Sequence, residues 1–181
     1  MQNPRLLLLA SACLVAPACG DDGDSGYEPT GTGPAAKLLC TSSSMNAFDT
    51  YGPEAFVAVN EKIFELVLAE LDANGEANLG GSFGTVTDFA TFKGQLASFL
   101  VFVYGGPDSI QYTDGKTYQG STQDMTAAHV GLAITDAQYD YFIANIVVPA
   151  LTGSGVPMDD VSSCFAPPVT DPAFKASIVG K

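Results

Sequence analysis

Tyr118–Phe142 reads YQGSTQDMTAAHVGLAITDAQYDYF, and this stretch contains His129, the only histidine in the 181 residues. A neutral imidazole is the commonest protein ligand for a metal. In a helix, the apolar residues Met125 and Leu132 would lie within about one turn of His129, so the imidazole would face an apolar environment. His129 is therefore either a metal ligand or a core histidine that finds its hydrogen-bond partner within the protein.

A strong helix start follows His129 in the sequence. Thr135 has the residue type of an N-cap, and Gln138 three positions later completes a capping box. These residues predict a short helix that carries His129, a turn at Gly131, and a long helix over residues 136–148.

Helical periodicity also predicts two long helices earlier in the chain. Pro53 is a favourable first helical residue, and apolar residues recur with helical spacing from there to Leu71. A second helix is expected over residues 86–104, where apolar residues cover more than one face. The residues 105–123 are punctuated by glycine and proline, which predicts a loop.

Prolines punctuate the last third of the sequence. Pro149 is expected to kink the helix that contains it, because proline lacks a backbone N–H donor. A last short helix should begin at Pro157 and stop at Pro167-Pro168. No internal repeat is evident, and residues 41–181 have the length of one domain with one core.

Five short motifs follow one another in this part of the chain. They are Gly105–Pro107 (GGP), Tyr118–Gly120 (YQG), Met125–His129 (MTAAH), Gly131–Phe142 (GLAITDAQYDYF) and Gly155–Pro157 (GVP). In this order they resemble the group I truncated haemoglobins, over roughly residues 45–171. The resemblance implies an all-α fold, a two-over-two helical sandwich around haem b, in which His129 matches the proximal ligand of the iron.

The resemblance also implies a haem pocket. Its expected lining residues are Phe64, Phe92, Gln95, Leu96, Phe99, Met125, His129, Leu132 and Phe142, with His129 as the metal ligand. Met125 and Leu132 are expected to orient His129 from the same helical face. The sequence departs from the family pattern where Phe64 replaces a usual tyrosine and Leu96 a frequent glutamine. Gln95 is then the expected donor to a bound gas, and loss of the usual donors predicts faster oxygen release.

The function that the resemblance implies is reversible binding of a diatomic gas, O2, NO or CO, at iron held by His129. Two alternatives remain open. One is a haem enzyme, a nitric-oxide dioxygenase or a peroxidase-like protein, which would need an electron donor such as a reductase. The other is a structural lipoprotein without a cofactor. The sequence contains no tryptophan, which argues against the group II branch of the family.

The first residues have the pattern of an export signal. Arg5 precedes an apolar run too short to cross a bilayer, and small residues stand before Cys19. This pattern resembles a bacterial lipoprotein signal over residues 1–18, with a lipidated Cys19, a flexible acidic linker over residues 19–40, and an exported protein anchored to the periplasmic or cell-surface side of a bacterial membrane. Cleavage before Cys13 and a plain secretory signal with a free Cys19 are the alternatives.

Cys40 and Cys164 are the cysteines of the predicted domain. Disulfides form in oxidising compartments, so an exported protein is expected to pair them. The alternatives are two free buried thiols or a metal pair, although no Cys-x-x-Cys or second histidine favours zinc.

The chain is strongly acidic, with a formal net charge of −13. A surface of this sign repels nucleic acid and anionic lipid, because both are recognised by basic patches. Charge therefore excludes nucleic acid as a partner but names no ligand.

Overall fold

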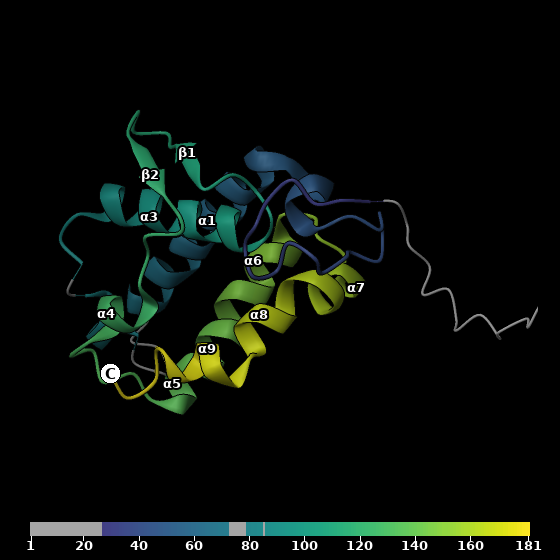
Figure 1. Ribbon diagram of the computed structural model, residues 1–181. Helices are drawn as coiled ribbons and strands as arrows, with labels where there is room; N and C mark the ends of the chain where they lie inside the picture. The colour runs from purple at the N-terminus through teal and green to yellow at the C-terminus, as the bar shows by residue number, and fades with distance from the viewer. Residues whose placement is uncertain (1–26, 73–78, 85) are drawn as a thin grey trace, which may run out of the picture.

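The computed structural model describes residues 27–72, 79–84 and 86–181, and these residues are mostly helical (Figure 1). The helices are α1 (Ala47–Asp72), α2 (Gly80–Phe83), α3 (Phe89–Val103), α4 (Met125–His129), α5 (Asp136–Phe142), α6 (Val148–Gly153), α7 (Met158–Asp160), α8 (Ala166–Thr170) and α9 (Pro172–Ala176), with the π-helical segments η1 (Ile143–Val147) and η2 (Val161–Phe165). The all-α prediction is correct at this level, with one small β-hairpin added.

The long helix α1 contains a bend near its start. Gly52 has φ 75° and ψ 169°, a backbone conformation that interrupts the helix and is accessible to glycine without steric cost. Pro53 then starts the straight part of α1, as its fixed φ and missing N–H favour. The helix predicted from Pro53 is therefore present, with an additional turn in front of it.

Helix α3 begins at Phe89, later than the predicted residue 86. The side chain of Asp88 accepts a hydrogen bond from the backbone N–H of Thr91 at 3.0 Å, which satisfies one of the free donors of the first turn. The start of the helix is therefore set by an N-cap that the apolar periodicity did not reveal.

The predicted loop 105–123 contains an antiparallel hairpin formed by β1 (Ser109–Gln111) and β2 (Thr117–Gln119). Asp114-Gly115 makes the turn, and the Asp114 carboxylate accepts from the Lys116 N–H at 3.0 Å. Asp-Gly between two short extended runs is a hairpin signal. The prediction of an unstructured connection is therefore wrong at this hairpin.

The prolines of the last third are accommodated by π turns. Helices α5, η1 and α6 form one continuous rod, in which the Val148 N–H bonds the Ile143 carbonyl just before Pro149. A wider turn relieves the clash between a proline ring and the carbonyl four residues earlier. Segment η2 likewise precedes Pro167-Pro168, so the last predicted helix runs on into α8 instead of stopping there.

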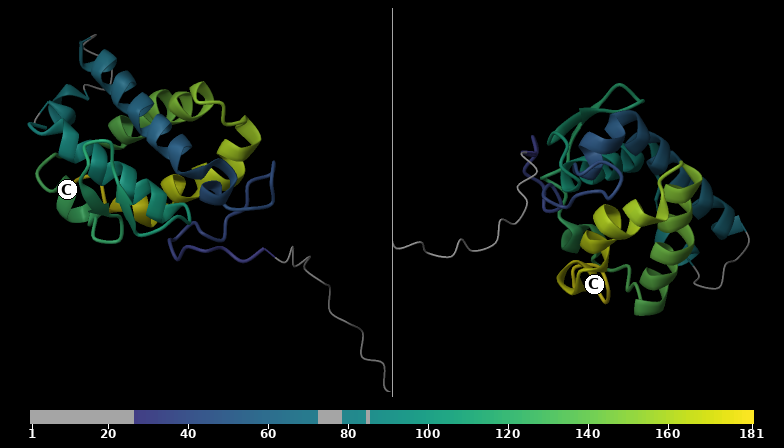
Figure 2. Two further views of the ribbon diagram at one scale, coloured as in Figure 1. Left: turned by 90° about the horizontal axis from the view of Figure 1, so that it is seen from above. Right: turned by 90° about the vertical axis from the view of Figure 1, so that its right-hand side faces the viewer.

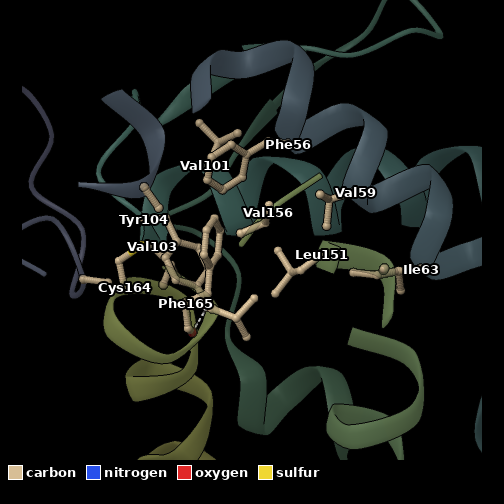
Figure 3. Close-up of a cluster of buried hydrophobic side chains, with 14 of the residues drawn as sticks. Phe56, Val59, Ile63, Val101, Val103, Tyr104, Leu151, Val156, Cys164 and Phe165 are labelled. Atoms are coloured by element: carbon tan, nitrogen blue, oxygen red, sulfur yellow. Dashed lines mark hydrogen bonds between the residues drawn. The ribbon is translucent and has the colours of Figure 1, made fainter. Parts of the chain in front are cut away.

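The core lies where α1 crosses α3 and the α5–η1–α6 rod (Figure 2). Its buried members come from elements far apart in the sequence and include Phe56, Val59, Ile63, Val101, Val103, Tyr104, Leu151, Val156, Cys164 and Phe165 (Figure 3). The rings of Tyr104 and Phe165 have centroids 5.2 Å apart, and Phe56 packs against both. This aromatic cluster joins α1, α3 and η2.

Residues 27–46, here named the strap, run along the C-terminal half of α3 before α1 begins. Ala35 and Ala36 are buried, and the Ala35 N–H donates to the Val103 carbonyl at 2.9 Å. The predicted flexible linker over residues 19–40 is therefore corrected for the part that packs on α3. Small side chains let the strap approach the helix closely, and composition alone did not distinguish this from a solvated linker.

The strap is fastened to η2 by the predicted disulfide. Cys40 and Cys164 are bonded, with Cα atoms 4.9 Å apart, and both are buried. Beside the bridge, the buried carboxylate of Asp160 accepts from the Ser42 N–H at 2.9 Å and from the Tyr51 hydroxyl. Burial alone would raise the pKa of Asp160, but these hydrogen bonds outweigh it and hold the pKa below its usual range.

None of the helices in the described ranges combines the length and the apolar character that crossing a membrane requires. The predicted signal peptide over residues 1–18 and the predicted lipidation site Cys19 lie outside the described residues.

Candidate cofactor site

A cavity of about 230 Å³ lies between α1, α3, α4 and the α5–η1 segment. An engineered apolar cavity of about 150 Å³ binds benzene, so this cavity is large enough for a ligand. Its walls are predominantly apolar, which is typical of a small-molecule or cofactor site.

Most of the predicted site residues line this cavity. They are Phe92, Gln95, Leu96, Phe99, Met125, His129 and Phe142. Helix α3 supplies the first four and α4 supplies Met125 and His129, so the two helices that sequence reasoning singled out are brought to the same space. The core residues Phe56, Val59 and Ile63 of α1 line the cavity as well.

Phe64 does not line the cavity, which corrects its predicted place in the wall. Its ring is fully buried between α1 and α3, edge-on to Phe92 at 5.4 Å between centroids. The Lys93 ammonium lies over the Phe64 ring, 5.4 Å from the ring centroid. The preceding residue, Ile63, lines the cavity instead. Successive residues of a helix point in different directions, so a shift of one position along α1 takes Phe64 away from the cavity.

Leu132 is also absent from the cavity wall. The prediction placed it on the helical face of His129, but α4 ends at His129. Val130 has extended backbone angles, φ −56° and ψ 127°, and Gly131 has φ 83°. The three-residue helical spacing between His129 and Leu132 is therefore interrupted, and the predicted turn at Gly131 is the reason.

His129 has a hydrogen bond that fixes which ring nitrogen carries the proton. Its Nδ1 lies 2.6 Å from the carbonyl oxygen of Met125, one turn earlier in α4. A carbonyl only accepts, so Nδ1 carries the hydrogen, and in the neutral imidazole the lone pair is on Nε2. No polar atom within the described part of the chain makes a hydrogen bond to Nε2, and the ring lines the cavity.

The position of α4 is set by a second N-cap. The Asp124 side chain accepts from the Ala127 N–H at 3.1 Å, which starts the helix directly before Met125. None of the residues of α4 is buried, although Met125 and His129 are half-covered. Helix α4 therefore places the His129 ring at the edge of the cavity and not deep in the core.

Three tyrosines line the cavity with their hydroxyl groups already bonded. Tyr51 donates to Asp160, Tyr104 donates to the Phe165 carbonyl at 2.7 Å, and Tyr139 donates to the Val169 carbonyl at 2.6 Å. Burial raises the pKa of Tyr51 and of Tyr139 to about 12, and it raises that of Tyr104 further. These phenols stay protonated at neutral pH, so their oxygens are neither bases nor anionic metal ligands.

Two glutamines are the polar side chains best placed to act on a ligand. The Gln95 amide makes no hydrogen bond within the described ranges, and it lies at the exposed edge of α3. The Gln123 Nε2 donates to the Gln119 carbonyl at 3.0 Å. Gln95 was predicted as a donor, whereas Gln123 was missed because it precedes α4 in a segment without periodicity.

Sequence reasoning also missed the end of the chain as part of the cavity. Phe174 and Ile178 both line it, and the Phe174 ring stacks on Phe99 with centroids 6.2 Å apart. The sequence did contain a signal for this segment. Phe174 and Ile178 follow Pro172 and are four positions apart, which is the spacing of residues on one face of a helix.

His129 is the histidine that lines the cavity. No group of three or more His, Cys, Asp or Glu side chains in the described residues could hold a metal ion. A porphyrin supplies four nitrogen ligands itself and needs one protein ligand and an apolar slot. Lys116 lies on the hairpin, with its ammonium 3.7 Å from an Asp114 oxygen, and is not among the residues that line the cavity. No family model and no curated protein matches the chain.

Proposed function

We propose that this chain is a haem protein of the truncated-haemoglobin type that reversibly binds a diatomic gas, with His129 as the proximal ligand of the iron. The observation that carries the proposal is the His129 imidazole, which lines the cavity and whose Nδ1–H donates to the Met125 carbonyl, so that the lone pair is on Nε2. Metal-bound histidines are characteristically oriented by such a bond from the other ring nitrogen.

The arrangement of the helices supports the same proposal. Helix α1 packs against α3 and against the α5–η1–α6 rod (Figures 1 and 2). Residues of α3 and of the short α4 line the same cavity. We take these contacts as support for a two-over-two helical sandwich within the mostly helical fold. The proposal therefore rests on a motif order and on a cavity that agree with each other.

When bound, haem would supply an iron atom with one open position for O2, NO or CO. The chain supplies the rest of the site. His129 donates a lone pair from Nε2, and the Met125 carbonyl keeps the ring in one tautomer and one orientation. Phe92, Leu96 and Phe99 form an apolar wall that excludes water, and Gln95 offers an N–H to the bound gas.

The gas-binding proposal is preferred over a haem enzyme because of the lining of the cavity. Peroxidase-like chemistry needs a proton acceptor at the reacting position. No Asp, Glu or Lys is among the lining residues within the described ranges, and the tyrosines are bound to protein oxygens.

The test is an absorption spectrum of the purified protein with haemin, oxidised and reduced, with and without CO. The wild-type chain is expected to give an intense Soret band that shifts with CO. His129→Gly should lose the wild-type spectrum, and added imidazole should restore it by occupying the vacated position. Val130→Ala, at an exposed position next in the sequence, is the matched control and should behave as wild type.

Two outcomes would contradict the proposal. One is a folded wild-type protein that binds no haemin. The other is a haemin complex whose spectrum is the same in wild type and in His129→Gly, because the iron would then be held elsewhere.

A further inference from the structure

The segment 172–181 covers one side of the cavity. It contains α9 and the turn after it, and it contributes Phe174 and Ile178 to the cavity wall. Phe174 lies nearly parallel to Phe99 of α3, with an interplanar angle of 13°. Ile178 is 8% exposed, so the segment buries apolar surface against the helices around the cavity.

The same segment is bonded to the loop that follows His129. The Gly180 N–H donates to the Ile134 carbonyl at 2.9 Å, and the Ala133 N–H donates to the Lys181 carbonyl at 3.0 Å. The end of the described chain thus lies beside the loop between α4 and α5 (Figure 1). These are backbone bonds, so they restrain the path of that loop directly.

One lysine connects the segment to α5. The Lys175 ammonium lies 2.7 Å from an Asp140 oxygen and 3.1 Å from an Asp136 oxygen. The Lys175 ammonium also lies 5.4 Å from the centroid of the ring of Tyr139, a residue that lines the cavity. The two carboxylates are largely exposed, which makes these ion pairs individually weak and sensitive to salt.

Helix α4 depends on such restraints because it buries no side chain completely. Asp124 fixes its first turn, and the loop after His129 fixes its last. We infer that residues 172–181 form a clasp that closes the cavity and holds the loop behind His129, with Lys175 as its positioning residue. The clasp opens locally, because the carboxylates of its ion pairs are exposed to solvent while the aromatic core behind it is buried.

This inference concerns access to the cavity and does not depend on which ligand occupies it. The experiment therefore uses the protein without cofactor and a neutral apolar dye, Nile red, whose fluorescence rises when it enters an apolar cavity. A neutral dye is needed because changing a lysine alters the charge near the opening. The rate of dye entry is measured by stopped flow.

Lys175→Met removes both ion pairs and keeps an apolar stem of similar length. We expect dye entry to become about three-fold to ten-fold faster, as the loss of two exposed ion pairs allows. Lys175→Arg should keep the wild-type rate. Lys62→Met is the matched control, because it removes an exposed ion pair with Glu65 at 2.8 Å from an element outside the clasp.

Hydrogen exchange provides a second readout at named amides. In Lys175→Met, the backbone N–H groups of Ala133 and Gly180 should exchange faster, while that of Tyr104 in the core should not change. About 1 M NaCl should accelerate dye entry into the wild-type protein toward the rate of the variant, because exposed charges are then screened.

The inference is overturned if Lys175→Met and high salt both leave the dye entry rate and these amides unchanged. It is also overturned if Lys62→Met accelerates entry as much as Lys175→Met does. Failure of haemin binding would refute the proposed function and leave the dye result intact, so the two ideas fail separately.

Discussion

At the scale of single residues, Gln95 and Leu96 are neighbours on α3 that both reach the cavity but differ in chemistry. Gln95 has a side-chain amide that can donate a hydrogen bond, whereas the side chain of Leu96 has no polar group. A hydrogen bond to a bound gas stabilises the bound state, so its donor slows release of the gas. The identity of the donor therefore decides ligand lifetime more than the apolar wall does.

Gln95→Leu is predicted to release O2 about two-fold to ten-fold faster from the reduced, haem-loaded protein, which corresponds to one neutral hydrogen bond. Release of CO should change less, because CO is a weaker acceptor. The measurement is flash photolysis and ligand replacement for both gases. Leu96→Gln is the reciprocal variant and should slow O2 release.

Gln111→Leu serves as the control for this pair. Its side chain is on the β1–β2 hairpin and donates to the Gly115 carbonyl, away from the cavity. If Gln95→Leu leaves O2 release at the wild-type rate, the Gln95 amide is not the donor, and Gln123 becomes the residue to examine.

At the scale of elements, the Cys40–Cys164 bridge joins the strap to η2 across 124 residues of sequence. Loss of this bridge should lower the free energy of unfolding by about 4 to 5 kcal/mol, since the unfolded chain regains the freedom of a long loop. Urea unfolding with and without a reductant, and of a Cys40→Ala, Cys164→Ala double variant, measures this effect.

The bridge does not act alone, because Asp160 and Ser42 connect the same elements. The double variant is therefore expected to keep its helical circular dichroism spectrum at low urea. Equal stability of the oxidised and reduced proteins would mean that these contacts already fix the strap, and the predicted loss would be refuted.

At the scale of the whole molecule, the cavity lowers the free energy of unfolding of the protein without a ligand. The apolar walls of this cavity of about 230 Å³ have no protein packing partners on the cavity side, so a ligand that fills it would add contacts to the folded state. A ligand that binds only the folded state adds stability by mass action.

Haemin is predicted to raise the free energy of unfolding by about 2.7 kcal/mol at a free concentration of about 100 times its Kd. Thermal unfolding at several haemin concentrations should show a Tm that rises with concentration. Iron-free protoporphyrin is the matched control ligand and should stabilise less, because His129 has no metal to bind. Equal stabilisation by the two compounds would show that the cavity binds a flat apolar ring without using His129.

Several features of this molecule follow from local sequence. The Thr135–Gln138 capping box, the turn at Gly131 and the helical start at Pro53 depend on residues that are neighbours in the chain, and each is present. The same holds for the helix that carries His129. Local hydrogen bonds and backbone preferences are readable because their partners are a few positions away.

Other features could not be read in this way. The place of Phe64 depends on how α1 is rotated against α3, and that rotation is set by packing over the whole core. The strap looks like a linker by composition, yet its small side chains fit against α3. The π turns before Pro149 and Pro167 arise because tertiary packing keeps the helices continuous where local preference alone would break them.

By itself, the sequence determined the helical character of the chain, the helix starts and the single histidine with its apolar neighbours. Only the tertiary structure decided that His129, Gln95 and Phe99 line the same cavity, and that Phe174 and Ile178 near the end of the described chain line it as well. The physical reason is range: caps and turns are bonds between near neighbours, whereas a cavity is the space left when distant elements pack together.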